Sequence, residues 1–425
     1  MKSIRLLALA TVLFCTSITN AQKYVGGDIS LLKKFVDSGA IYKDKDGKDV
    51  EPYTFFKDQG WNAVRLRLFV DPTKASETQR KEGAIQDLDY VIAMAKEVKT
   101  AGFKLMLDFH YSDTWTDPGK HSTPASWTGD AAQLANAVYT YTKESLKKLK
   151  DAGVTPDFIQ PGNEITYGMM WPTAHIWPGG GGQDGGTWDN FTSYLKNAIK
   201  ACKEECQDAQ IVIHTEMSKA ENVTNFYSEL AKYPDVQYDI IGLSYYPDYH
   251  NSLDVLGNTL TKLETNHANK KIMIVETGYG FEWQLADKKY DFTNIYPTTE
   301  DGQKKFTKDL ISLLNAHPNV NGLFWWYPEY TLNNIVFKDG SEDWSKNFTS
   351  GYWNAALFHY KTGKALSALY ELKDFLAGGT GISSLDADKA DDPFWYSLDG
   401  RRMNNKPQAK GIYLNNGKKI IINDK

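Results

Sequence analysis

Two glutamates in this sequence of 425 residues each stand at the end of a short apolar run. Glu164 follows Asn163 in the stretch DFIQPGNEITYGMMWP, and Glu276 belongs to the stretch IMIVET. Apolar surroundings raise the pKa of a carboxyl group, whereas a nearby cation keeps a carboxylate ionised. A protonated and an ionised carboxyl group about 5 Å apart can serve as the acid and the nucleophile of retaining glycoside hydrolysis. The two glutamates are therefore candidates for this chemistry.

A cation for one of these carboxylates is present in the run NAVRLRLF. Its apolar residues alternate with Arg65 and Arg67, so in a β-strand both arginines point to the face opposite the leucines. If that face is the inside of a barrel, each arginine must be paired, because a lone buried charge is very costly. Such an arginine would keep the carboxylate of the nucleophile ionised.

Other strand-like runs also end in polar or aromatic residues. The run LMLDFHYSDTW places Asp108 and His110 on one face, and Trp326 ends another run. Asn163 could hydrogen-bond a sugar hydroxyl beside the reacting carbon. A salt bridge at a barrel rim would explain any one carboxylate at such a position. The two glutamates, the arginines, the Asn-Glu pair and the tryptophan together favour a catalytic site.

The elements that must position these residues follow from the periodicity of the chain. Strand-like runs alternate with helical patterns, two of which run into Gly102 and Gly153, where helix C-termini are expected. Eight strands each followed by a helix predict an α/β fold, a (β/α)8 TIM barrel. An open doubly wound sheet is the alternative, but no strand is followed by Gly-x-Gly-x-x-Gly. The predicted strands are Tyr24–Ile29, Ala63–Phe69, Lys104–Phe109, Phe158–Pro161, Gln210–His214, Ile240–Tyr245, Lys271–Val275 and Val320–Trp326.

Long segments follow the fourth, seventh and eighth predicted strands. They contain WPGGGGQDGG, GYGFEWQLADKKYDFTNIYPTTE and YPEYTLNNIVFKDGSEDWSKNFTSGYWN. Loops that follow barrel strands form the C-terminal face, where active sites of this fold are built. The glycine run could instead be a flexible linker, but its position before a helical pattern at Trp188–Lys203 favours a loop within one domain.

Residues 1–21 have the features of a secretory signal peptide. Lys2 and Arg5 precede an apolar run too short to span a bilayer, and small residues lead to a cleavage site after Ala21. We therefore expect export to the periplasm, the cell surface or the medium. Lipidation at Cys15 is an alternative, which the bulky Phe14 before it disfavours.

Residues 22–378 are predicted to form the catalytic domain, and residues 379–425 a linker and a small β-rich appendage with turn pairs such as Asp399-Gly400. A formal net charge of −5 gives no basic surface for nucleic acid or anionic membrane, and no later apolar run is long enough for a transmembrane helix. After cleavage only Cys202 and Cys206 remain, so neither a disulfide framework nor a zinc site is expected. The 12 Trp and 25 Tyr residues suit stacking against sugars or filling of a core.

Seven motifs occur in order along the chain: GGDISLLKKF, DKDGKDVEPYTFFKDQGWNAVRLRLFVDP, LMLDFHYSDTWTDPGKH, QPGNEITYGMMWP, DIIGLSYYPDYH, IMIVETGYG and GLFWWYPEY. Together they resemble those of the endo-β-1,4-galactanases of glycoside hydrolase family 53. The resemblance covers residues 24–378 and implies a secreted, retaining (β/α)8 enzyme. Such an enzyme cleaves internal β-1,4-galactosidic bonds in galactan or type I arabinogalactan, and its chemistry requires no cofactor. We expect a monomer whose partner is the polysaccharide.

The resemblance also implies roles for single residues. It makes Glu164 the acid/base and Glu276 the nucleophile, with Asn163 in contact with the sugar at the cleavage point. Arg65 is preferred as the partner of the nucleophile, with Arg67 close behind it.

The remaining implied residues bind substrate. Tyr246 is preferred as the hydrogen-bond donor from the sixth strand, with Tyr245 as the alternative. The residues implied to line the sugar sites are Asp28, His110, Asp113, Trp115 and Trp326.

The chain departs from the family pattern at two places. Some members hold calcium between the loops after strands seven and eight through an aspartate-rich run, but here the first loop reads QLADKKYDFTNIYP, whose two lysines argue against that site. The eighth strand ends in Trp-Tyr-Pro where many relatives have Trp-Glu-Pro. A β-mannanase or cellulase of the same mechanism remains an alternative, because the catalytic residues do not separate these substrates. A non-catalytic polysaccharide-binding barrel would require loss of Glu164 or Glu276, and both are present.

Overall fold

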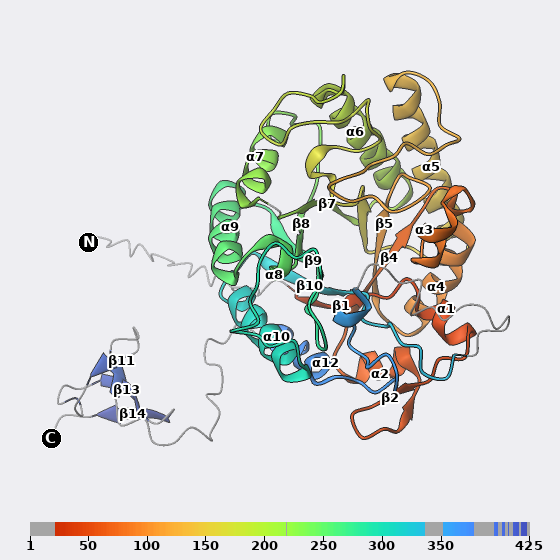
Figure 1. Ribbon diagram of the computed structural model, residues 1–425. Helices are drawn as coiled ribbons and strands as arrows, with labels where there is room; N and C mark the ends of the chain where they lie inside the picture. Colours follow the sequence, from red (N-terminus) through yellow and green to blue (C-terminus); the bar gives the residue numbers. More distant parts are fainter. Residues whose placement is uncertain are drawn as a thin grey trace, which may run out of the picture. The chain divides into compact units, whose positions relative to one another are not determined.

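A parallel β-barrel forms the centre of the computed structural model (Figure 1). The structure describes residues 22–217, 219–335 and 352–377, together with 395–397, 402–403, 407, 411–415 and 418–422. The predicted signal peptide and Cys15 therefore lie outside the described residues. Eight strands close the barrel in the order in which they follow one another along the chain. They are β1 (Tyr24–Asp28), β4 (Ala63–Leu68), β5 (Lys104–Phe109), β6 (Phe158–Pro161), β7 (Gln210–Glu216), β8 (Ile240–Tyr245), β9 (Lys271–Thr277) and β10 (Val320–Trp326).

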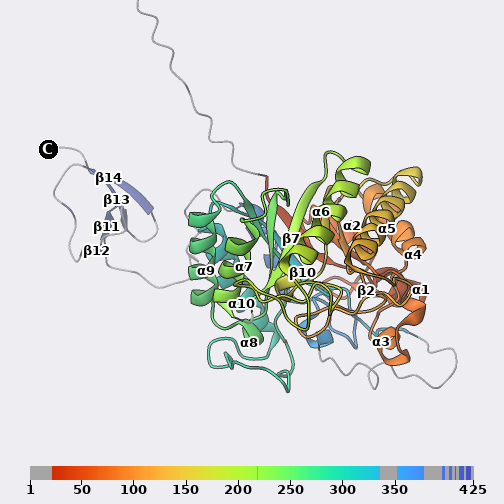
Figure 2. The same ribbon diagram turned by 90° about the horizontal axis from the view of Figure 1, so that it is seen from above.

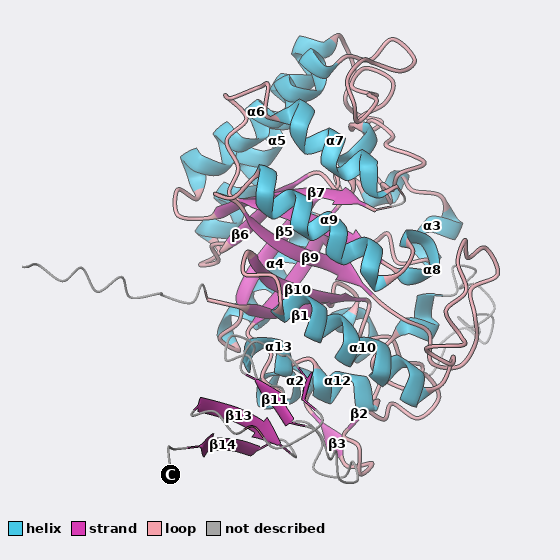
Figure 3. Cartoon of the chain, turned by 90° about the vertical axis from the view of Figure 1, so that its left-hand side faces the viewer, coloured by secondary structure: helices cyan, strands magenta, loops and turns pink. Residues whose placement is uncertain are grey.

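Helices cover the outside of the barrel, as Figures 2 and 3 show from two sides. The predicted (β/α)8 fold is thus confirmed, with every predicted strand in its place. The principal helices between the strands, and the one after the last strand, are α2 (Pro52–Asp58), α4 (Leu88–Thr100), α5 (Ala131–Asp151), α6 (Trp188–Glu205), α7 (Ala220–Leu230), α9 (Leu253–Asn266), α10 (Glu300–Asn315) and α12 (Ser367–Glu371).

Local signals in the sequence account for the ends of these helices. Asp130 begins α5 with a capping box, in which its side chain accepts from the backbone N–H of Gln133 and the Gln133 side chain accepts from the Asp130 N–H. The same helix ends before Gly153, whose φ of +82° is a conformation that glycine adopts without strain. Capping therefore fixes the helix limits, and burial of one helix face against the barrel supplies most of the stability.

Shorter elements belong to the loops between the strands and helices. Many of them follow barrel strands and so contribute to the C-terminal face. They are α1 (Leu32–Asp37), β2 (Tyr42–Lys43), β3 (Asp49–Val50), η1 (Pro72–Lys74), α3 (Glu77–Lys81), η2 (Ile165–Tyr167), α8 (Pro247–His250), η3 (Tyr352–Ala355) and α13 (Asp374–Ala377).

The barrel interior changes from apolar to polar along the strands. One layer of inward side chains is a separate apolar cluster that includes Ala63, Met106 and Phe158. Because inward positions recur every second residue, Arg65, Asp108 and Gln160 occupy the next layer toward the carboxyl ends. The apolar layer fills the barrel nearer the amino ends of the strands, and the polar side chains meet at its C-terminal face.

The glycine-rich segment after β6 is an ordered loop of the barrel. The Ile176 N–H donates to the Tyr167 carbonyl, and the Gln183 N–H donates to the His175 carbonyl. These hydrogen bonds connect the segment to earlier residues of the same loop, as expected of an insertion within one domain. The segment is therefore not a linker. Residues 336–351 of the loop after β10 lie outside the described residues.

The chain divides into two compact units with a boundary between Leu376 and Ala377, close to the limit of 378 expected from the sequence. The second unit contains a four-stranded antiparallel sheet in the order β12-β11-β13-β14. In the first unit, Cys202 and Cys206 are free thiols. Among the helices that the structure describes, none is long and apolar enough to cross a bilayer. The strands of the second unit are β11 (Trp395–Ser397), β12 (Arg402–Met403), β13 (Gly411–Asn415) and β14 (Lys418–Ile422).

Candidate active site

Glu276 reaches the barrel interior because the pairing of β8 with β9 is irregular. Leu243 pairs with Ile274, but Ser244 pairs with Glu276, so β9 contains one extra residue at this point. In a regular strand, Glu276 would face away from Met273 and Val275, which lie in the interior layer. The shifted register places Glu276 opposite Ser244, which lies on the inward side of β8.

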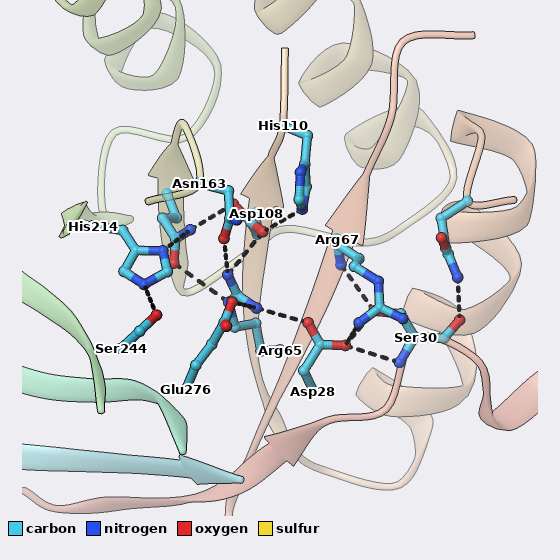
Figure 4. A network of polar contacts seen from close by, with 12 residues as sticks. Asp28, Ser30, Arg65, Arg67, Asp108, His110, Asn163, His214, Ser244 and Glu276 are labelled. Atoms are coloured by element: carbon cyan, nitrogen blue, oxygen red, sulfur yellow. Dashed lines mark hydrogen bonds and ion pairs between the residues drawn. The ribbon is translucent and has the colours of Figure 1, made fainter. Parts of the chain in front are cut away.

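Arg65 stands at the centre of a buried network of charged groups (Figure 4). Its Nη1 lies 2.8 Å from Asp28 Oδ2 and 2.9 Å from Glu276 Oε1. Its Nη2 lies 2.8 Å from Asp108 Oδ2 and donates to Asn163 Oδ1 at 2.9 Å. All the groups are buried, so the guanidinium gains the pairing that its burial requires. Arg65 is thus the direct partner of Glu276, and it shares its charge among three carboxylates.

Arg67 occupies a different position, beside the aromatic wall of the site. Its Nη1 lies 2.9 Å from Asp28 Oδ1, and its guanidinium lies 4.6 Å from the ring centroid of Trp115. Trp326 also contacts this guanidinium, at 5.9 Å. Asp28 therefore holds both arginines, and a hydrogen bond of 2.6 Å from the Ser30 hydroxyl orients its carboxylate.

Glu164 has a backbone conformation that few residues other than glycine adopt. It follows β6 after Gly162, and its φ of 49° and ψ of 47° lie in the left-handed region. Two buried histidines hold this conformation. The Glu164 N–H donates to His214 Nδ1 at 3.2 Å, and its carbonyl lies 3.2 Å from His121 Nε2. A strained residue that its surroundings fix in this way is typical of a functional position.

His214 connects the backbone of Glu164 to its side chain. Burial lowers the pKa of His214 well below its usual range, so the imidazole is neutral. Its Nδ1 accepts the Glu164 N–H, and the proton is therefore on Nε2, which donates to Ser244 Oγ at 2.8 Å. The Ser244 hydroxyl can then donate its own proton to the Glu164 carboxyl group, with which it forms a hydrogen bond. Gln160 extends this network from His214 to Asp108.

His110 and Asn163 are fixed by the loop after β5. The Thr116 N–H donates to His110 Nδ1 at 3.2 Å, so the proton of this imidazole is on Nε2, which lies 3.2 Å from Asp108. The Asn163 amide donates to the Thr116 carbonyl at 2.8 Å. This bond uses one of the two Nδ2 hydrogens of Asn163, and the other is available to a sugar hydroxyl.

Both glutamates have raised pKa values, and burial is the largest cause for each. Burial, followed by the negative charge of Glu276, raises the pKa of Glu164 well above its usual range. Burial also raises the pKa of Glu276 to about 7, although Arg65 opposes this shift and Asp108 and Asp28 add to it. The raised pKa of Glu164 agrees with the expectation that this glutamate is protonated. The expectation that an arginine keeps the nucleophile ionised did not include Asp28 and Asp108, which share Arg65 with Glu276 and add to the rise of its pKa.

Tyr246 donates a hydrogen bond of 3.1 Å to Glu276 Oε2. Tyr245 lies on the other face of β8, where its hydroxyl donates to the Asn251 carbonyl at 2.8 Å. The structure thus brings Tyr246 to the carboxylate and leaves Tyr245 outside the site. Strand alternation explains the difference, because adjacent residues point to opposite faces.

A cleft of about 670 Å³ opens above these groups on the C-terminal face. Asp28 does not border it, because the two arginines cover its carboxylate. Arg65 is likewise fully buried beneath the cleft. Asp113 belongs to the loop after β5, where its carboxylate accepts hydrogen bonds from the backbone N–H groups of Asp71 and Ala125. The residues expected from the sequence that do line the cleft are Arg67, His110, Trp115, Asn163, Glu164, Tyr246, Glu276 and Trp326.

Sequence reasoning missed several residues of the site. His214 and Glu216 follow Val212 at alternate positions of β7, so both point inward, and Glu216 lines the cleft. The two-residue periodicity that identified Arg65 and Arg67 would also have found them. Ser244 had no comparable signal, because a serine in a strand is common. Tyr167, Tyr249 and His250 come from loops and line the cleft as well.

The loop after β9 bears on the question of calcium. Lys288 Nζ lies 2.8 Å from Asp291 Oδ2, so a lysine and an aspartate of this loop are paired with each other. Within the described ranges, no group of three or more His, Cys, Asp or Glu side chains is arranged to hold a metal ion. The loop after β10, which the family pattern would also involve, is described only in part.

The contact between Tyr246 and Glu276 predicts a change in pH dependence. In Tyr246→Phe, Glu276 loses a hydrogen bond that stabilises its ionised form, so its pKa should rise. If Glu276 must be ionised to react, the acidic limb of the kcat/KM profile should move to higher pH by about one unit. Tyr245→Phe is the matched control and should leave both limbs in place. An equal loss of kcat/KM at every pH, with no movement of the acidic limb, would show that Tyr246 does not stabilise the ionised form of Glu276.

Comparisons with known proteins agree with this geometry. The model of the family described as Glycosyl hydrolase family 53 matches residues 24–372. The chain is 30% identical to an arabinogalactan endo-beta-1,4-galactanase of Cellvibrio japonicus, over 73% of this chain and 81% of that protein. Among solved structures, the GH53 catalytic domain of Ignisphaera aggregans is 30% identical, with a TM-score of 0.70, and covers 84% of this chain and 96% of its own. A fungal beta-1,4-galactanase is 28% identical, with a TM-score of 0.69, over 83% of this chain and 99% of that one. The protein therefore belongs to glycosyl hydrolase family 53.

Proposed function

We propose that this protein is a retaining endo-β-1,4-galactanase. The observation that carries the proposal is the pairing of two buried glutamates with opposite surroundings in one cleft. Burial and the negative charge of Glu276 favour the protonated form of Glu164, whereas Glu276 contacts Arg65 and Tyr246. Family membership and the names of the relatives, galactanases of bacterial and fungal origin, support galactan as the substrate.

In the first step, the Glu276 carboxylate attacks the anomeric carbon from the face opposite the leaving group. A C–O bond forms to Glu276 while the glycosidic C–O bond breaks, and the leaving oxygen takes the proton of Glu164. Asn163 is fixed beside this centre by Arg65 and Thr116, where its free Nδ2 hydrogen can bind a hydroxyl of the reacting sugar. Arg65 and Tyr246 stabilise the carboxylate before it attacks.

In the second step, Glu164 changes from acid to base. After the first proton transfer, its negative charge is stabilised by the hydrogen bond from Ser244, whose hydroxyl His214 orients. Glu164 then takes a proton from water, whose oxygen attacks the anomeric carbon, and Glu276 leaves. The product keeps the β configuration, because two displacements invert the centre twice.

The proposal also includes the localisation, the oligomeric state and the cofactor requirement of the enzyme. We propose that the chain is exported, as the features of residues 1–21 suggest, and that it acts as a monomer on the polysaccharide. The two carboxyl groups and water supply all the bonds and protons of both steps, so the reaction requires no cofactor. The alternative substrates are mannan and cellulose, because the catalytic groups act on any β-1,4 bond whose anomeric oxygen is equatorial.

A parallel assay separates these substrates. Linear galactan, mannan and cellulose are incubated with the protein, and new reducing ends and product sizes are measured. We expect galactan to be cut into short oligosaccharides at a rate at least about 100-fold above the other two, since a site built around one hydroxyl rejects its epimer strongly. NMR of the first products should show the β anomer. Equal rates on mannan, or an initial α anomer, would overturn the proposal.

A further inference from the structure

One exposed tryptophan lies on an ordered loop beside the cleft. The Trp177 side chain belongs to the few large apolar groups exposed in the described part of the chain, with 53% of its surface open to solvent. The others are the aliphatic residues Val36 and Ile295. An indole offers a large apolar face, and a polysaccharide-degrading protein has a use for such a face because sugar rings present apolar C–H groups to it.

Backbone hydrogen bonds hold Trp177 in place. Its N–H donates to the Gly181 carbonyl at 3.1 Å, and its carbonyl accepts from the Gly180 N–H at 3.0 Å. The same carbonyl accepts from Nε1 of Trp188, at the start of α6, at 3.0 Å. The ring is therefore presented to solvent by a tight turn that is tied to a helix of the barrel. A backbone held in this way loses little conformational entropy when the loop binds a ligand.

Trp177 continues one wall of the catalytic cleft. Its ring meets that of Tyr167 edge to face, with 6.3 Å between the centroids, and Tyr167 lines the cleft. Tyr167 ends the short helix η2, which begins directly after Glu164. This wall is thus connected through η2 to the residue that protonates the leaving oxygen in the proposed reaction. A cleft of about 670 Å³ is the size of a pocket for a drug-sized ligand, so a polysaccharide must extend beyond it.

We propose that Trp177 binds a galactose ring of the polysaccharide outside the cleft, on the leaving-group side. The inference rests on the proposed function, since it takes galactan as the ligand and Glu164 as the acid. The apolar face of one sugar lies on the exposed indole, while the chain between that sugar and the cleavage point passes Tyr167. Trp177 thereby favours long chains over short ones without taking part in the chemistry.

The test compares Trp177→Ala with the wild-type protein on two substrates. KM for long galactan should rise about fivefold, which is the effect of losing one stacked ring, and kcat should not change. On a nitrophenyl β-1,4-galactobioside, whose leaving group ends near the cleavage point, kcat/KM should be unchanged. Trp177→Phe, which keeps an aromatic face, should restore most of the affinity, and Val36→Ala serves as a control for loss of an exposed apolar side chain.

Affinity electrophoresis in gels that contain galactan gives a second readout that does not depend on turnover. The wild-type protein should be retarded more than Trp177→Ala, and both should migrate alike in a gel with mannan. Equal retardation of the two proteins in galactan, or an unchanged KM, would overturn the inference. An equal loss on both substrates would also overturn it, because the substitution would then act through Tyr167 on the cleft. If the wild-type protein bound galactan through Trp177 but did not cleave it, the proposed function would be wrong, whereas the proposed role of Trp177 in binding would be supported.

Discussion

Replacing Glu276 with alanine is expected to lower kcat on galactan by at least about 10⁴-fold, because no other group can attack the anomeric carbon from that face. The fold should persist, since Arg65 keeps its contacts with Asp28, Asp108 and Asn163. Thermal unfolding close to that of the wild-type protein would verify this. The loss of turnover should appear on every substrate, including those with good leaving groups, because the first step itself fails.

Azide distinguishes a lost nucleophile from other causes of inactivity. In Glu276→Ala the removed carboxylate leaves space for azide, which can attack the anomeric carbon from the same side while Glu164 protonates the leaving oxygen. The product should be the α-galactosyl azide, formed by a single inversion. In Glu276→Gln the amide fills that space, so azide should not restore activity. A β-azide from the alanine variant, or activity in either variant without azide, would show that Glu276 is not the nucleophile.

Replacing Glu164 with alanine should produce a different pattern. On galactan, kcat should fall by about 10²–10⁴-fold, since the leaving oxygen no longer receives a proton. A dinitrophenyl β-1,4-galactobioside has a leaving group that needs no protonation, so its first step should proceed and release a burst of dinitrophenolate. The glycosyl-enzyme should then accumulate, because no base activates water. Stopped-flow absorbance measures the burst, and mass spectrometry detects the adduct on Glu276.

Azide provides the matching control for Glu164. It needs no general base, so it should restore turnover of the activated substrate in Glu164→Ala by attacking the glycosyl-enzyme. This attack comes from the face opposite Glu276, and the product should be the β-galactosyl azide. Opposite anomers from the two alanine variants would assign both roles in one comparison. The absence of a burst in Glu164→Ala would contradict its role as the acid, because loss of the acid leaves the first step of this substrate intact.

Much of the fold could be predicted because the periodicity of the chain is local. The alternation in NAVRLRLF directs Arg65 and Arg67 to one face of β4 whatever the rest of the fold does, and the structure places both arginines inside the barrel. Glycines such as Gly153 end helices through their own backbone freedom. In the same way, Glu164 and Glu276 could be placed at strand ends. Each of these inferences depends only on residues that are neighbours in the sequence.

The division of roles within the polar network could not be predicted, because it depends on side chains from different strands. Asp28 was expected to line the sugar sites, but in the structure it does not line the cleft and instead holds Arg65 and Arg67. His214 was not foreseen, although it accepts the backbone N–H that keeps Glu164 in its left-handed conformation. Which carboxylate reaches the cleft and which one orients an arginine is decided only when the strands are side by side.

The sequence by itself determined which carboxyl groups are available at the ends of the barrel strands and which strands supply the cations. The tertiary structure decided how those groups face one another. Strand alternation alone would direct Glu276 to the face opposite Met273 and Val275, away from the interior. Only the shifted pairing, in which Glu276 is opposite Ser244, turns it toward Arg65. The physical reason is that a register shift depends on hydrogen bonding between two strands, which no local pattern in either strand specifies.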